Sequence, residues 1–79
     1  MKNVLVVIFD EVAKLYSSPL TFQNLDTAKR YFRTLMMKND TPTDYKLYQI
    51  GEVCPQANDL TEYLEVNLEF IESGVKPKE

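Results

Sequence analysis

The chain has 79 residues, a formal net charge of −3, one cysteine and no histidine. This length suits a single domain, which we expect to span residues 1–79, ordered over about 3–72 with a frayed tail at 73–79. The absence of histidine removes most catalytic triads and zinc sites, and the lone Cys54 cannot form an internal disulfide. We therefore expect no enzyme activity, no metal and no cofactor, and the absence of a long apolar run predicts no membrane segment.

The first predicted element is the run Val4–Phe9, which contains only aliphatic and aromatic residues and stops at Asp10. A short, continuous apolar run is typical of a strand covered on both faces in the middle of a sheet. Residues 11–23 leave two possibilities open: a helical turn capped by Asp10, or a short edge strand over residues 14–22. We favour the edge strand, because Pro19 is tolerated at an edge or a bulge.

A helix is predicted from Asn24 to Lys38. Asn24 is a good N-cap because its side chain can accept a hydrogen bond from a free amide of the first turn, and Asp26 complements the helix dipole. Turn-forming residues at 39–43 end the helix. One apolar stripe should face the core, formed by Leu25, Ala28, Phe32, Leu35 and Met36.

Two more strands follow. Residues 44–51 form the first, which Gly51 ends, and a loop covers residues 52–61. From Tyr63 to Ile71 apolar and polar residues alternate, which indicates a strand with one solvated face. The predicted fold class is α+β, a small three- to four-stranded sheet with one main helix packed on one face. A homodimer is a candidate assembly, because domains this small often need added buried area.

A cluster of positive charge marks the predicted helix. Four basic residues and no acidic one lie between Lys29 and Lys38. Basic side chains interleaved with an aromatic ring can follow a nucleic-acid backbone and stack a base, although Asp26 could also neutralise an ordinary solvated helix face. Tyr45 and Tyr48 lie on opposite faces of their strand, so only one can join a stacking platform. The candidate nucleic-acid-binding residues are Lys29, Arg30, Tyr31, Arg33 and Lys46.

The C-terminal part is acidic. Between Glu52 and Glu72 there are six acidic residues and no basic one. The alternating strand could pair with another chain by strand addition, and the candidate protein-interaction residues are Tyr63, Glu65, Asn67 and Glu69. Two of these carboxylates, on Glu65 and Glu69, would lie about 13 Å apart along a strand, too far to share a metal ion. A nuclease built on Asp10 and Glu11 lacks a further carboxylate in a matching motif.

Two segments carry a family resemblance. Residues 28–32 read Ala-Lys-Arg-Tyr-Phe, and residues 44–52 read Asp-Tyr-Lys-Leu-Tyr-Gln-Ile-Gly-Glu. With the Phe9-Asp10-Glu11 run, they resemble the small nonstructural protein of gokushovirus-type microviruses, which are single-stranded-DNA phages. The resemblance covers about residues 3–52, and the chain departs from the pattern after Glu52. The more specific of the two segments is the second, since it fixes several residue types within nine positions.

The resemblance implies a non-enzymatic phage protein of the host bacterial cytoplasm. Such a protein acts in viral genome replication or in the switch to single-strand synthesis and packaging. The first functional hypothesis is therefore binding of single-stranded DNA, with Arg30 as the residue that the resemblance favours. The alternative is a protein-interaction module that binds a viral replication, capsid or host protein.

Overall fold

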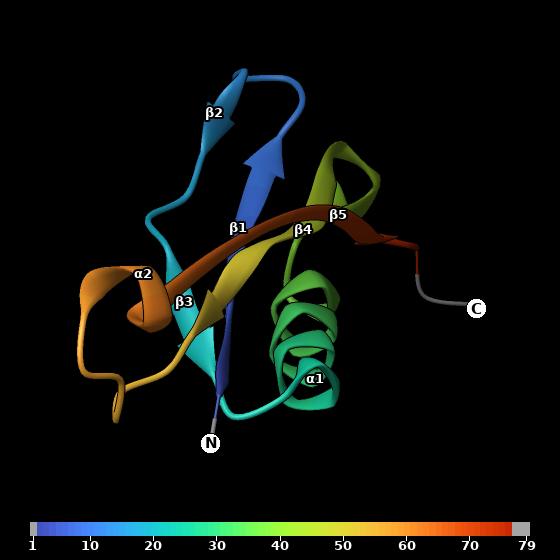
Figure 1. The fold of residues 1–79 in the computed structure, drawn as a ribbon. Coiled ribbons are helices and arrows are strands. Elements are labelled where there is room, and N and C mark those ends of the chain that lie inside the picture. Colours follow the sequence, from blue (N-terminus) through green and yellow to red (C-terminus); the bar gives the residue numbers. More distant parts are fainter. Residues whose placement is uncertain (1, 77–79) are drawn as a thin grey trace.

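The structure is a computed structural model that describes residues 2–76. Its centre is a five-stranded sheet in which every pairing is antiparallel. The order is β2-β1-β4-β5, and β3 pairs with β1 beside β2. The strands are β1 (Asn3–Asp10), β2 (Leu15–Tyr16), β3 (Leu20–Phe22), β4 (Tyr45–Val53) and β5 (Leu64–Ser73). One main helix, α1 (Leu25–Met37), packs on one face of this sheet, which confirms the predicted α+β class (Figure 1).

The extra strand comes from residues 14–22. The predicted edge strand is present, but it is divided into β2 and β3 around Pro19, so the sheet has five strands and not three or four. At the break, the backbone N–H of Ile8 donates to the hydroxyl of Ser17 (2.9 Å), and the N–H of Ser17 donates to the carbonyl of Ile8 (2.8 Å). A side-chain oxygen thus replaces part of the ladder that a proline-containing segment cannot complete.

Local signals explain α1. The side chain of Asn24 accepts a hydrogen bond from the backbone N–H of Thr27 at 2.9 Å, as the N-cap prediction requires. Ala28, Phe32 and Met36 of the predicted stripe are buried, whereas Leu35 is 40% exposed. The helix therefore contacts the sheet along a narrower line than the stripe suggested.

The core lies between α1 and the sheet. It combines the helix residues with Val4, Val6 and Ile8 of β1 and Leu47 of β4. Gly74 follows β5, and its backbone N–H donates a hydrogen bond to the carbonyl of Tyr45, the first residue of β4, at 2.9 Å. Of the tail predicted at 73–79, Ser73 is the last residue of β5 and Gly74 is buried, and residues 77–79 lie outside the described part.

The C-terminal third differs from the prediction at its start. Tyr63 ends a short helix, α2 (Leu60–Tyr63), instead of beginning a strand. Asp59 caps α2 by accepting a hydrogen bond from the N–H of Glu62 at 2.9 Å. A 3-10 turn, η1 (Pro42–Asp44), leads into β4. Among residues 2–76, no helix has the length and apolar character that a membrane crossing requires.

The two faces of the sheet differ. The helix-side face carries the core, and the ladder places the alternate residues on the other face, which α1 does not cover. Here we call this second surface the open face. The predicted strand at 63–71 was expected to keep one face out of water, but its apolar row is on the open face and is exposed by 42–76%. The open face comprises Asn3, Leu5, Val7, Phe9, Tyr16, Thr21, Lys46, Tyr48, Gly51, Val53, Leu64, Val66, Leu68, Phe70 and Ser73.

Candidate nucleic-acid interface

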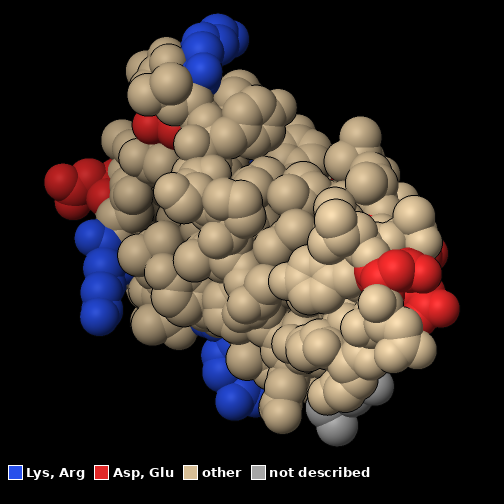
Figure 2. All heavy atoms as spheres, turned by 60° about the vertical axis from the view of Figure 1, so that its left-hand side comes forward, with Lys and Arg blue, Asp and Glu red and all other residues tan. Residues whose placement is uncertain are grey.

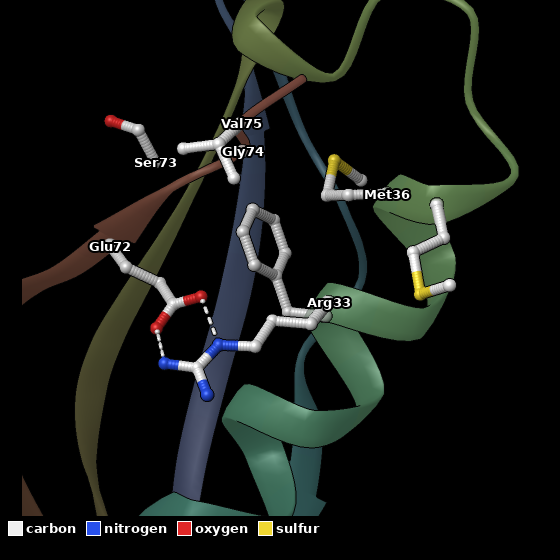
Figure 3. Close-up of a pocket in the computed structure, with 8 residues that line it drawn as sticks. Arg33, Met36, Glu72, Ser73, Gly74 and Val75 are labelled. Carbon is white, nitrogen blue, oxygen red and sulfur yellow. Dashed lines mark hydrogen bonds and ion pairs between the residues drawn. The ribbon is translucent and has the colours of Figure 1, made fainter. Parts of the chain in front are cut away.

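Arg33, one of the predicted nucleic-acid-binding cations, forms an ion pair with Glu72. Its guanidinium donates two hydrogen bonds to the carboxylate of Glu72, at 2.9 and 3.0 Å. The pair borders an apolar hollow of about 430 Å³ between α1 and the end of β5, whose lining includes Phe32 and Met36 (Figure 3). The hydrogen bond and charge of Glu72 raise the pKa of Arg33 above its ordinary value. The bidentate pairing with Glu72 neutralises the charge of Arg33, so this side chain is not free to contact a phosphate group.

Lys46 lies on the other side of the molecule. Its ladder partner is Phe9, so it belongs to the open face, while α1 covers the opposite face. Its ammonium group pairs with the carboxylate of Glu11. The five predicted nucleic-acid residues therefore do not form one surface, because the sheet separates Lys46 from the four residues on α1.

Lys29, Arg30 and Tyr31 remain on the exposed side of α1. Within residues 2–76, neither Lys29 nor Arg30 forms an ion pair. The ring of Tyr31 contacts Phe22 of β3, with ring centroids 5.3 Å apart, and stays 44% exposed. Two cations and one ring that already contacts Phe22 make a small candidate DNA-binding surface, in a protein whose net charge is −3.

The open face has a larger set of aromatic rings. Phe9 and Tyr16 stack with ring centroids 4.5 Å apart, and Tyr48 meets Phe70 edge-on at 5.6 Å. The four rings come from β1, β2, β4 and β5, and the antiparallel ladders bring them to the same side of the sheet. Tyr16 is 64% exposed and Phe70 is 51% exposed. Exposed rings in a row across a sheet provide flat apolar surfaces on which planar groups can stack.

The charge on the open face is low and of one sign. Its ladder residues include one cation, Lys46, and no carboxylate, although the chain has 12 acidic residues. Figure 2 looks onto this side and shows a broad uncharged centre with charged side chains around its margin. A hollow of about 300 Å³ lies in it, between Tyr16, Tyr48, Leu68 and Phe70.

The predicted protein-interaction residues lie along α2 and β5. Glu65, Asn67 and Glu69 are exposed on the helix-side row of β5, and Tyr63 is 42% exposed at the end of α2. Glu65 forms an exposed ion pair of 3.2 Å with Lys2, whose pKa the hydrogen bond and charge of Glu65 raise. Glu65, Asn67 and Glu69 form a row along the edge strand β5, and Tyr63 precedes this strand.

Phe9, Tyr16 and Phe70 were not among the site residues predicted from the sequence. The signal was present for Tyr48, which was expected to lie opposite Tyr45, and the structure confirms that the two point to opposite faces. Applying the same two-residue period to β1 and β5 would have grouped Phe9 and Phe70 with Tyr48 once the strand order was known. Among residues 2–76, no three His, Cys, Asp or Glu side chains converge as a metal site.

The fold and this surface define a small α+β protein with an exposed aromatic sheet face. Residues 3–74 match the model of a family described as Phage ORF5 protein, and the chain belongs to that family. It is therefore a phage protein. No curated protein and no solved structure gives a significant match.

Proposed function

We propose that this phage protein binds single-stranded DNA on the open face. It would act without enzymatic activity, in the cytoplasm of the bacterial host, during replication of the viral genome or the switch to single-strand synthesis and packaging. The resemblance of residues 28–32 and 44–52 to microvirus proteins supports this setting, because those phages carry single-stranded DNA genomes.

One observation carries the proposal: four aromatic rings from four strands lie on a sheet face that has no ladder carboxylate. Proteins that bind single strands stack successive bases on such rings, at about 1–3 kcal/mol per base, with little dependence on sequence. Tyr16 and Phe70 would stack bases at the two ends of the row, since these rings have the most exposed surface of the four.

The charges of the face indicate how binding should respond to salt. Lys46 on the face pairs with Glu11, which leaves Lys14, in the turn before Tyr16, as the unpaired cation adjoining the rings in sequence among residues 2–76. With about one phosphate contact, the logarithm of the binding constant should fall with the logarithm of salt concentration at a slope of about −0.7. Binding that depends on stacking would thus survive moderate salt, unlike binding by a broad cationic surface.

The test is a fluorescence-anisotropy titration with a labelled oligothymidylate of about 12 nucleotides. Tyr16→Ala and Phe70→Ala should each weaken binding about ten-fold, which corresponds to the loss of roughly one stacked base. Tyr31→Ala is the matched control, because it removes an exposed tyrosine ring from the helix side. Arg30→Ala tests the cations of α1 in the same way. Circular dichroism confirms that each variant is folded.

Two results would reject the open-face site. One is the absence of binding at low salt with protein in the micromolar range. The other is a larger loss of affinity in Tyr31→Ala and Arg30→Ala than in Tyr16→Ala and Phe70→Ala, which would place the DNA along α1.

The second candidate function is a module that binds a viral replication, capsid or host protein. The observation in its favour is the row of Leu64, Val66 and Leu68 on the open face, exposed by 42–76%, since large exposed apolar patches commonly mark binding sites. A protein partner that persists after nuclease treatment and is lost in Leu68→Glu, in a chain that fails to bind the oligonucleotide, would favour this function.

A further inference from the structure

The outer edge of β5 has no strand partner among residues 2–76. β5 ends the sheet order, pairs only with β4, and is ten residues long. Every residue from Leu64 to Phe70 is exposed. The strand contains no proline and no lysine, two of the residues with which proteins commonly protect a free edge. Such an edge offers a row of free backbone donors and acceptors to an added strand.

The side chains of this edge form two separate rows. Leu64, Val66 and Leu68 lie on the open face, and Glu65, Asn67 and Glu69 lie on the helix side. In an antiparallel pair, residues directly opposite each other project from the same face. An added strand with the same two rows could therefore keep apolar residues beside apolar residues and polar residues beside polar ones.

We propose that the added strand is β5 of a second copy of this chain. If Val66 lies opposite Val66 of the second copy, Leu64 meets Leu68 and Glu65 meets Asn67. If Leu68 lies opposite itself, Asn67 meets Glu69. Both registers avoid opposed like charges, whereas centring on Asn67 would place Glu65 against Glu69 twice, which is destabilising.

Such a dimer joins two sheets into one. Because the axis of the pair is perpendicular to the sheet, the two open faces lie on the same side and form a continuous surface. The paired segment, residues 64–70, spans about 23 Å, and so narrow a contact buries less than the roughly 800 Å² per partner of a standard interface. The dimer should be weak and reversible, and a DNA strand long enough to cross both copies would promote it. That last consequence rests on the proposed function, whereas the pairing itself does not.

Asn67 gives the test, since both allowed registers place it against a glutamate of the second copy. Asn67→Lys should tighten dimerisation about five-fold, by creating two opposite-charge pairs, and Asn67→Glu should weaken it by a similar factor. Sedimentation velocity over a series of protein concentrations without DNA measures both effects. Thr34→Lys and Thr34→Glu are the controls, because they make the same charge changes on an exposed position of α1 and should leave dimerisation unchanged.

The proposal is overturned if the wild type and Asn67→Lys both stay monomeric at the highest concentration. It is also overturned if a dimer forms but the two Asn67 variants do not move it in opposite directions, as expected for a dimer through the open face. Titration with an oligonucleotide that covers one copy reports on DNA binding separately. A dimer without DNA binding would reject only the proposed function, and DNA binding by a permanent monomer would reject only the dimer.

Discussion

Gly51 of β4 lies so close to β5 that a Cβ atom at this position would overlap the carbonyl oxygen of Glu65. The approach follows a β-bulge at Ile50, where the β4 register shifts against both of its neighbours. We expect Gly51→Ala to lower the free energy of unfolding by about 1–3 kcal/mol, because the backbone of β5 must move to admit the methyl group. Urea denaturation measures the change, and Thr43→Ala at an exposed position is the control. An unchanged midpoint would show that β5 can shift freely.

Two apolar side chains of α1, Phe32 and Leu35, should differ sharply in how much they stabilise the folded state. Phe32 is fully buried, and Leu35 is 40% exposed although both belong to the predicted apolar stripe. Phe32→Ala should cost about 3–5 kcal/mol of stability through lost burial and a cavity. Leu35→Ala should cost much less, because much of its surface is already in water. Thermal and chemical denaturation compare the two variants. Equal losses of stability would contradict the packing of α1 on the sheet, in which Phe32 is buried and Leu35 is partly exposed.

Local signals made much of the fold predictable. The N-cap at Asn24 and the spacing of Ala28, Phe32 and Met36 are properties of neighbouring residues, and the structure confirms both. Likewise, the run of β1 and the turn before β4 needed no long-range information. Pro19 indicated an edge, but a proline alone does not show that the segment divides into two strands.

The site could be predicted less well because it depends on long-range geometry. Arg33 and Glu72 are 39 residues apart, so no sequence spacing showed that a carboxylate would neutralise this cation. The alternation in β5 revealed an apolar row, but a two-residue period does not tell whether another element covers that row. The aromatic set is divided among four strands, and only the strand order brings the rings to one face.

Freeing Arg33 should not create a DNA site on α1. Glu72→Gln removes the negative charge that the guanidinium contacts and leaves Lys29, Arg30 and Arg33 as three unneutralised cations on one helix. If DNA binds the open face, affinity for the oligothymidylate should stay within about two-fold of wild type at moderate salt, where long-range charge effects are screened. Anisotropy titrations of wild type and Glu72→Gln measure this. A clear gain in affinity would instead indicate that the DNA binds along α1.

The carboxylate of Asp59 should make the stability of the α2 region depend on pH. It accepts hydrogen bonds from the hydroxyl of Thr61 at 2.7 Å and the N–H of Glu62 at 2.9 Å. These bonds lower the pKa of Asp59 below its ordinary value of 3.8. A carboxyl group whose pKa is lower in the folded state stabilises the fold above its unfolded pKa, and this contribution is lost as pH falls through the folded pKa.

Asp59→Asn isolates the charge, because asparagine is also a good N-cap. We expect the variant to melt at a lower temperature than wild type at neutral pH, and the difference to shrink as the pH falls below about 4. Melting curves followed by circular dichroism at neutral and acidic pH measure both quantities. Asp40→Asn serves as the control, since it removes an exposed carboxylate that caps no helix. A difference for Asp59→Asn that stays constant down to strongly acidic pH would mean that the ionised carboxylate does not hold the start of α2, and that the cap acts through neutral hydrogen bonds alone.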